Sequence, residues 1–155
     1  MKTTVATRVL GVSEVSALRG MLTVFGTAFQ DTETYCKAQP DDDYLGRLLS
    51  NEGFVAVAAY EGDNIIGGLA GYILPKFEQA RSEFYIYDLA VDEGHRRKGV
   101  ATSMIQCLKT YVDSRGFFVI FGQADYGDEA AIALYTKLGI REDVMHFDID
   151  PRSAA

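Results

Sequence analysis

Hydrophobic and polar residues recur along the chain with two periods, and the switches between those periods predict the order of its helices and strands. The apolar positions from Val5 to Leu10 have strand spacing. Ser13 can then cap a helix whose apolar face extends to about Phe25. A second helix is predicted to start at Pro40 and Asp41, because both residues are typical of a first helical turn.

Three strand-like runs occupy the middle of the chain. Phe54 to Tyr60 and Ile65 to Leu74 are joined by Glu61 to Asn64, whose residues suit a hairpin turn. The third run, Glu83 to Val91, alternates along its length, and we expect it to be antiparallel to the run before it and covered on both faces. One face is predicted to carry Phe84, Ile86 and Asp88, and the other to carry Tyr85, Tyr87 and Leu89.

The second half of the chain returns to helical spacing. A helix is predicted from Gly99 to Tyr111, and Gly116 ends it before a strand over Phe117 to Gln123. Strand, helix and strand over this length predict a right-handed crossover between parallel neighbours. A further helix from Asp128 or Glu129 to Lys137, ended by Gly139, and a closing strand from Val144 to Ile149 complete the order. Helices on a mixed sheet, an α/β or α+β fold, are therefore expected.

Size and composition indicate one domain. With 155 residues, of which 48% are hydrophobic, the chain suits a single compact domain over residues 1–155. The longest apolar run near the middle, Phe54 to Tyr60, is far shorter than the roughly 20 residues that a membrane helix needs. The first residues lack the apolar segment of a secretory signal. We therefore expect a cytoplasmic protein with no membrane partner.

The charge and the rare reactive residues exclude several functions. A formal net charge of -7 would repel a phosphate backbone and attract a polycation, which argues against a nucleic-acid partner. Cys36 and Cys107 lie far apart, and His95 and His146 have no spacing typical of a metal site or a catalytic triad. We predict reduced thiols, no metal and no histidine catalysis.

The turn Arg96-Arg97-Lys98-Gly99-Val100-Ala101 has the chemistry of an anion site. It lies between a buried strand and a helix, where backbone N–H groups and the helix dipole converge. Gly99 lacks the Cβ atom that would block a close approach, and the basic side chains can contact phosphate oxygens. The alternative is a merely solvated helix start. The other common nucleotide motifs, GxxxxGK[ST] and GxGxxG after a strand, do not occur.

These motifs resemble those of a known superfamily. The pattern R-x-x-G-x-A after a hydrophobic strand is similar to the coenzyme A loop of the GNAT N-acetyltransferases, and AIALYTKLGI, Ala131 to Ile140, is similar to the helix that lines the cofactor thiol there. The stretches QPDDDYLGRLL, YILPKFEQARSEFYIYDLAV and QADYGDEAAIALYTKLGIREDVMHFDID resemble the aminoglycoside 3-N-acetyltransferases of the gentamicin-resistance type, from about Leu10 to Asp150.

The resemblance implies both a fold and a reaction. The fold would be a mixed central sheet flanked by helices on both faces, and the protein would be a homodimer. The reaction would move the acetyl group of acetyl-CoA, as co-substrate, to the 3-amino group of the central deoxystreptamine ring of an aminoglycoside. The expected physiological effect is antibiotic resistance.

Acetyl transfer to an amine needs a proton acceptor, an oxyanion donor and a stabilised leaving thiolate. Asp88, at the end of an aromatic strand, is assigned to positioning and deprotonating the amine, and Tyr135 is carried over as proton donor to the thiolate. The backbone near Leu89 and Ala90 would bind the acetyl oxygen and pantetheine. The full cofactor set is Leu89, Ala90, Val91, Arg96, Arg97, Lys98, Gly99, Val100, Ala101 and Thr102, and the substrate set is Tyr87, Asp88, Asp125, Tyr126, Asp128, Glu129 and Asp148.

Plainer roles stay open for several of these residues. Asp88 also suits a structural hydrogen bond, Tyr135 a core position, and Asp148 the solvation of the C-terminal segment. Polyamines or protein amines are alternative acetyl acceptors, because an acidic cleft suits them too. A coenzyme A-binding module without catalysis is a third interpretation.

Overall fold

The computed structural model of the chain describes residues 4–154 and contains a five-stranded mixed sheet. In spatial order the strands are β1 (Val5–Val9), β2 (Phe54–Glu61), β3 (Asn64–Pro75), β4 (Ser82–Val91) and β5 (Val119–Gly122). The first four are antiparallel neighbours, and β5 is parallel to β4. The mixed sheet and the parallel crossover pair predicted from sequence are thus confirmed.

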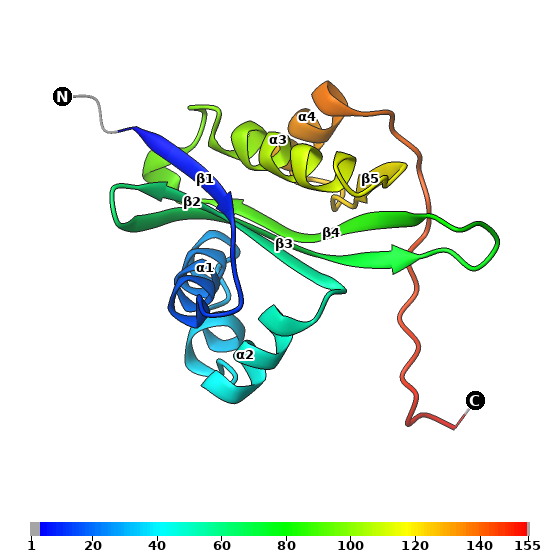
Figure 1. Ribbon diagram of the computed structural model, residues 1–155, viewed down its shortest axis with the longest axis horizontal. Coiled ribbons are helices and arrows are strands. Elements are labelled where there is room, and N and C mark those ends of the chain that lie inside the picture. The colour runs from blue at the N-terminus through cyan, green and yellow to red at the C-terminus, as the bar shows by residue number, and fades with distance from the viewer. Residues whose placement is uncertain (1–3, 155) are drawn as a thin grey trace. The chain divides into compact units, whose positions relative to one another are not determined.

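Helices cover both faces of this sheet, as expected. Figure 1 shows α1 (Val15–Ala28) and α2 (Asp42–Ser50) on one face and α3 (Val100–Asp113) on the other. A π-helical turn, η1 (Glu33–Lys37), joins α1 to α2, and a 3-10 turn, η2 (Glu93–His95), follows β4. The chain divides between Gln123 and Ala124 into two compact units, and the second contains α4 (Glu129–Leu138).

Local signals account for most helix and strand ends. The Asp41 carboxylate accepts a hydrogen bond from the Tyr44 N–H at 2.9 Å and caps α2 as predicted. Gly62, in the β2–β3 turn, has a φ of 61°, a conformation that favours glycine. The expectation for Ser13 was wrong. Helix α1 begins after Glu14, with no side-chain cap, because the Glu14 carboxylate instead binds the Gly11 N–H and pairs with Arg8.

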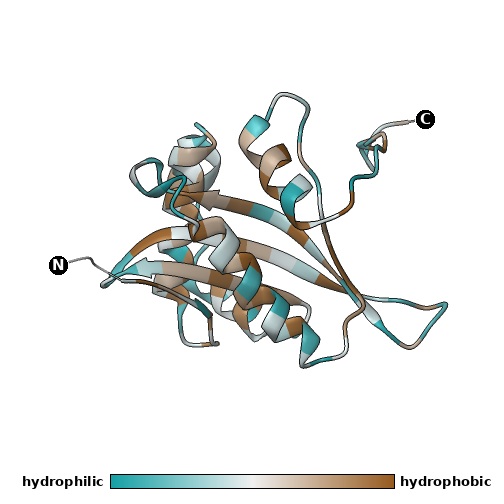
Figure 2. Cartoon of the chain, turned by 90° about the horizontal axis from the view of Figure 1, so that it is seen from above, coloured by the Kyte–Doolittle hydropathy of each residue, from teal (hydrophilic) through white to brown (hydrophobic). Residues whose placement is uncertain are grey.

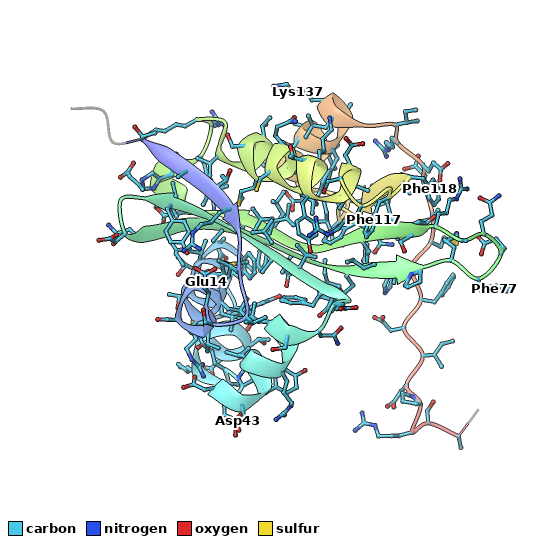
Figure 3. All side chains as sticks on the ribbon, in the orientation of Figure 1. Glu14, Asp43, Phe77, Phe117, Phe118 and Lys137 are labelled. Atoms are coloured by element: carbon cyan, nitrogen blue, oxygen red, sulfur yellow. The ribbon has the colours of Figure 1, made fainter. Side chains whose placement is uncertain are left out.

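Hydrophobic side chains pack against both faces of the sheet. We call the group under α1 and α2 the α1 cluster: Leu10, Leu18, Met21, Phe25, Leu45, Leu49, Ala56, Ala58 and Ala90. The other face is covered by α3 through Val100, Met104, Ile105, Leu108 and Val112. Figure 2 shows hydrophobic residues recurring along the strands and mostly hydrophilic ones in the β3–β4 loop. Phe77 is an exception, because it is fully exposed at the tip of that loop (Figure 3).

The pairing of β3 with β4 contains a β-bulge. Ala70 lies opposite Asp88, and its neighbour Gly71 lies opposite Ile86, so Tyr87 is an extra residue on β4. Because side chains alternate along a strand, one extra residue exchanges the faces of all residues that follow it. Asp88 therefore does not share a face with Ile86, and the alternation predicted from sequence is wrong here.

Packing on each side identifies the two faces. Ala90 belongs to the α1 cluster, and Asp88, two residues earlier, points to the same side. Gly71 points to the α3 side, where a Cβ atom would lie 2.6 Å from a ring carbon of Phe84. Its partner Ile86 points there too. The bulge thus moves the Asp88 carboxylate from the α3 face to the α1 face.

The second unit contains one helix and no strand within its described residues, 124–154. The Asp128 carboxylate accepts a hydrogen bond from the Ala131 N–H at 3.2 Å and caps α4, which confirms the predicted helix start. The predicted strand from Val144 to Ile149 is wrong, since these residues form no ladder. The alternation is present, but this unit offers no second strand for pairing, and Phe147 and Ile149 are 76% and 86% exposed.

We predict that Gly71→Ala destabilises the protein, because the new methyl group would collide with the Tyr85 carbonyl oxygen and the Phe84 ring. Overpacking of this kind costs about 1–3 kcal/mol. Urea unfolding followed by circular dichroism measures the change. Gly46→Ala is the matched control, because Gly46 lies inside α2 with open space, and alanine there should stabilise by about 0.5–1 kcal/mol. Equal stability of the two variants would contradict the steric argument.

Candidate active site

Asp88 is a half-buried carboxylate at the bulge of β4. The Tyr35 hydroxyl, from η1, donates a hydrogen bond to its Oδ1 atom at 3.4 Å. Burial raises the pKa of Asp88 above its ordinary value, and the bond from Tyr35 partly opposes that rise. A carboxyl group of raised pKa binds a proton more readily than an exposed one, as a general base requires.

Aromatic rings form a continuous strip across four strands on the same face. Phe54 of β2 contacts Tyr72 of β3 at 5.6 Å between centroids, and Tyr72 contacts Tyr87 of β4 at 5.9 Å. Tyr87 contacts Tyr85 at 5.9 Å, and Tyr85 stacks on Phe121 of β5 at 4.9 Å. We call these five residues the aromatic strip.

The aromatic strip and Asp88 interact electrostatically. Burial raises the pKa of Tyr72 and of Tyr85, and the Asp88 charge adds to both rises. The Tyr85 hydroxyl donates to the Gln123 side-chain oxygen at 2.8 Å. Tyr87 is 62% exposed. The strip thus offers aromatic faces and phenol oxygens beside a carboxylate, a combination that suits a ligand with ammonium groups and sugar rings.

Strand β4 has a partner on both sides only along its first half. The parallel pairing with β5 ends at Ile86, opposite Gly122. From Asp88 to Val91 the pairing of β4 that the structure describes is with β3 alone. Leu89, Ala90 and Val91, which the sequence assigned to the cofactor, therefore lie along an open stretch of strand, where backbone N–H groups facing away from β3 have no ladder partner.

The loop after β4 places positively charged residues at the start of α3. Arg97 and Gly99 have φ values of 61° and 80°, and the first helical hydrogen bond runs from the Ser103 N–H to the Gly99 carbonyl at 2.9 Å. The N–H groups of the turn before Ser103, those of Val100, Ala101 and Thr102, are the ones that a helix leaves without intrahelical acceptors. Turns with left-handed residues at a helix start bind anions.

The backbone of this loop is open to a ligand at Gly99. A Cβ atom at Gly99 would meet no described heavy atom within 4 Å, so a ligand can approach the backbone there. The Arg96 side chain donates to the Val91 carbonyl at 3.1 Å and ties the loop to the end of β4. Lys98 donates to the Gly94 carbonyl at 3.3 Å, and all three basic side chains are exposed.

His95 fastens the same loop to the sheet. Its Nδ1 atom lies 2.9 Å from an Asp92 oxygen and its Nε2 atom 3.3 Å from a Glu61 oxygen at the β2–β3 turn. The bonds to Asp92 and then Glu61 raise the pKa of His95. The sequence indicated no catalytic histidine, and the contacts of His95 are those of an anchor.

The remaining sequence-predicted residues belong to the second unit. Tyr135 is half-buried on α4, Asp125 and Glu129 are exposed, and Asp128 is the helix cap described above. Tyr126 is exposed, and its hydroxyl lies 3.5 Å from an Asp143 oxygen. Asp148 lies 2.8 Å from His146 Nε2.

Tyr35 and Tyr72, of the first unit, are among the residues that enter the site without having been predicted. Tyr35 lies in a π-helical turn that has no clear hydrophobic period, and nothing in the local sequence points to it. Tyr72 was assigned only to a strand, and a tyrosine there most often fills a sheet face. Tyr72 lies near Asp88 because of the register between β3 and β4, which the sequence alone does not give.

Residues 4–154 contain no group of three or more His, Cys, Asp or Glu side chains arranged to hold a metal ion. None of the described helices is both long enough and apolar enough to cross a membrane. Cys36 and Cys107 are free thiols.

We predict that Asp88→Asn stabilises the protein at pH 7. Because the pKa of Asp88 is raised in the folded state, the folded chain holds this proton more tightly than the unfolded chain does. The unfolding free energy therefore falls as pH rises from the ordinary Asp value of about 3.9 through the raised pKa, and stays lower above it. The asparagine side chain does not ionise, so the unfolding free energy of the variant does not fall in this way as pH rises.

Urea unfolding between about pH 3.5 and about pH 8 measures the difference in unfolding free energy between the two proteins. This range begins just below the ordinary Asp pKa of roughly 4 and extends above it. The gain should vanish at the acidic end. Asp63→Asn makes the same change in the exposed β2–β3 turn and is the control for the change of residue type alone. A variant that is less stable than the parent at pH 7 would mean that the buried carboxylate contributes favourably as an ion.

Comparison with known proteins identifies the family. Residues 20–140 match the acetyltransferase (GNAT) family model. An aminoglycoside acetyltransferase from an uncultured soil metagenomic sample is 52% identical with a TM-score of 0.93, over 95% of this chain and 98% of that one. A second aminoglycoside acetyltransferase from an uncultured soil metagenomic sample, in complex with sisomicin, is 27% identical with a TM-score of 0.88, over 96% and 97% of the two chains.

A curated relative is more distant. N-acetyltransferase 8B of Rattus norvegicus is 20% identical over 105 residues, which are 68% of this chain and 47% of that protein. The chain spans less than half the length of the curated relatives that it matches. The family match nevertheless extends over most of the chain, and the observed sheet and helices agree with it. The chain belongs to the GNAT acetyltransferase family.

Proposed function

We propose that this protein transfers the acetyl group of acetyl-CoA to the 3-amino group of the deoxystreptamine ring of gentamicin-type aminoglycosides, and that it thereby confers resistance. The observation that carries this proposal is the half-buried Asp88 carboxylate beside the aromatic strip, at the open end of β4. A cationic sugar presents ammonium groups to the carboxylate and apolar ring faces to the tyrosines.

The relatives support the acceptor class. The chain that is 52% identical is described as an aminoglycoside acetyltransferase, and so is the more distant one, which was solved with sisomicin bound. The position acetylated rests on the sequence resemblance to the 3-N-acetyltransferases. The GNAT resemblance implies a homodimer, and light scattering on the purified protein tests this oligomeric state. The cytoplasmic location proposed with it rests on the sequence features described above.

The loop and the open strand are suited to coenzyme A. Gly99 and the first turn of α3 would receive the pyrophosphate, with Arg96, Arg97 and Lys98 around it. Along Leu89 to Val91, the N–H groups that face away from β3 would bind pantetheine and the acetyl oxygen. Acetyl-CoA supplies the activated acetyl group, and no metal takes part in the proposed reaction.

In the proposed reaction, Asp88 and Tyr135 each carry out one proton transfer. The Asp88 carboxylate accepts a proton from the substrate ammonium, directly or through a water molecule, and leaves a neutral amine to attack the acetyl carbon. The amide bond forms as the carbon–sulfur bond breaks, and the Tyr135 phenol protonates the sulfur. The second proton that the nitrogen loses then restores the phenol, through water. The phenol's ordinary pKa of about 10 lies close to the thiol's of about 8.5, so this transfer is uphill by only about 1.5 pKa units, or ~2 kcal/mol. Catalysis is direct, without a covalent intermediate on the protein.

Acidic and aromatic residues complete the proposed acceptor site. Tyr87, on the aromatic strip, would pack on a sugar ring, as would the exposed Tyr126. Further ammonium groups are proposed to pair with Asp125, Asp128, Glu129 and Asp148. Two of these carboxylates already have hydrogen bonds, Asp128 as the helix cap and Asp148 with His146.

A substrate panel separates this proposal from its alternatives. We expect gentamicin and sisomicin to be acetylated with saturating acetyl-CoA, and two-dimensional NMR of the product to place the acetyl group on the 3-amino nitrogen. Spermidine and a lysine-rich peptide test the polyamine and protein alternatives. Turnover of either one alone, or acetylation at another amine, would replace the proposed acceptor. Coenzyme A binding with no turnover of any amine would support a non-catalytic module.

Gly99→Asp should weaken acetyl-CoA binding, because the carboxylate would oppose the pyrophosphate at a backbone position with φ of 80°. We expect a loss of about tenfold or more in affinity, or ~1.4 kcal/mol, by calorimetry. Gly116→Asp is the matched control. Gly116, beyond the other end of α3, has a φ of 73° and equally open space, so that variant has the same strain and charge away from the loop. Equal losses of affinity in both variants would rule out a specific role for Gly99.

A further inference from the structure

The Tyr35 hydroxyl donates a hydrogen bond to Asp88, the carboxylate that the proposed reaction needs as a proton acceptor. The carbonyl and the ring of Tyr35 are both fixed. The carbonyl accepts a bond from the Gln39 side chain at 2.9 Å, and Arg19 of α1 holds the Gln39 oxygen at 2.9 Å. The ring packs edge-on against Phe25 at 6.1 Å and Phe29 at 5.5 Å.

A glycine in α1 makes this arrangement possible. At Gly26, a Cβ atom would lie 2.5 Å from the Cys36 sulfur and 3.2 Å from the Tyr35 Cβ atom. A side chain there would displace the Cys36 sulfur and crowd Tyr35. The turn is therefore seated close to the helix, and its tyrosine reaches across to β4.

Among the side-chain hydrogen bonds that the structure describes, the one that reaches Asp88 comes from Tyr35. The other groups near Asp88 interact with it or with its neighbours in different ways. Tyr72 and Tyr85 respond to the Asp88 charge without donating to it, and Tyr87 interacts with the tyrosines around it. From α2, Tyr44 interacts with Tyr72. The Arg19 guanidinium of α1 is bound to Asp42 at 2.6 Å, so this cation is engaged elsewhere.

We propose that Tyr35 is a positioning residue for Asp88, holding the carboxylate toward the acceptor amine and favouring its ionised form. This rests on the proposed function, in which ionised Asp88 is the base. Burial and the Asp88 charge raise the pKa of Tyr35 to about 12, so its phenol stays protonated and remains a donor at working pH. The 3.4 Å separation exceeds the roughly 2.7–2.8 Å of a strong O–H···O bond, and such contacts often shorten when substrate binds.

The direction of the effect follows from charge. A donated hydrogen bond stabilises a carboxylate relative to the acid, and its removal leaves burial unopposed, so Asp88 should lose its proton only at higher pH. Tyr35→Phe removes the hydroxyl and keeps the ring. We expect the acidic limb of the kcat/KM profile to move to higher pH, with a loss of roughly three- to tenfold below the limb and recovery above it.

The experiment measures pH profiles of kcat/KM for gentamicin acetylation with the full-length chain. Tyr111→Phe is the matched control, because Tyr111 lies on α3 with its ring against Arg115 and the change also deletes one phenol oxygen. That variant should leave the limb in place. Asp88→Asn should lower kcat about a hundredfold or more and remove the limb, and adding Tyr35→Phe to it should cost nothing further.

The outcomes separate the two proposals. If Asp88→Asn loses activity but Tyr35→Phe lowers kcat/KM equally at every pH, or leaves it unchanged, the positioning role is wrong and the base assignment stands. If Asp88→Asn retains full activity, Asp88 is not the base and the role of Tyr35 falls with it. Thermal unfolding of Tyr35→Phe checks that the fold is intact.

Discussion

Tyr87 has no partner on β3, and every side chain after it changes sides as a result. Without that extra residue, Asp88 would lie among Phe84 and Ile86 under α3, where an ionised carboxylate would be costly. With it, the carboxylate joins the face that carries the aromatic strip. The collision that a side chain at Gly71 would suffer shows how closely the two strands approach beside the bulge. The placement of the acid beside these aromatic rings depends on this local irregularity.

The ionised form of Asp88 lowers the stability of the fold, yet it is the form that the proposed reaction needs. Burial opposes its ionised form, while the Tyr35 hydroxyl favours it, and the net effect is a raised pKa. The close seating of η1 on α1 at Gly26 provides the favourable part of that balance. The cofactor loop is held by different means, through His95 to the β2–β3 turn and through Arg96 to the end of β4. The two halves of the proposed site are thus anchored independently and meet along β4.

Sequence patterns predicted those parts of the fold that depend on neighbouring residues. The helix starts at Asp41 and Asp128, the turn at Gly62 and the glycine turn before α3 all follow from local chemistry. The bulge did not, because the alternation of Tyr85, Ile86, Tyr87 and Asp88 reads as a regular strand and the irregularity arises only against β3. Tyr35 was missed for a similar reason, since its partner lies 53 residues away. The strand predicted over Val144 to Ile149 failed because alternation alone does not supply a pairing partner.

The order of the strands also governs how the chain assembles. Strands β2, β3 and β4 are spatial neighbours that follow one another closely along the chain, and β2 and β3 are joined by a turn of only Gly62 and Asp63. Pairing β4 with β5 instead requires the chain to close a loop that contains the whole of α3, which costs more chain entropy. Local antiparallel pairing therefore precedes the parallel pair in the least costly folding order. Asp88 and its bulge belong to the early part of that order, whereas Phe121, the last ring of the aromatic strip, is added when β5 docks.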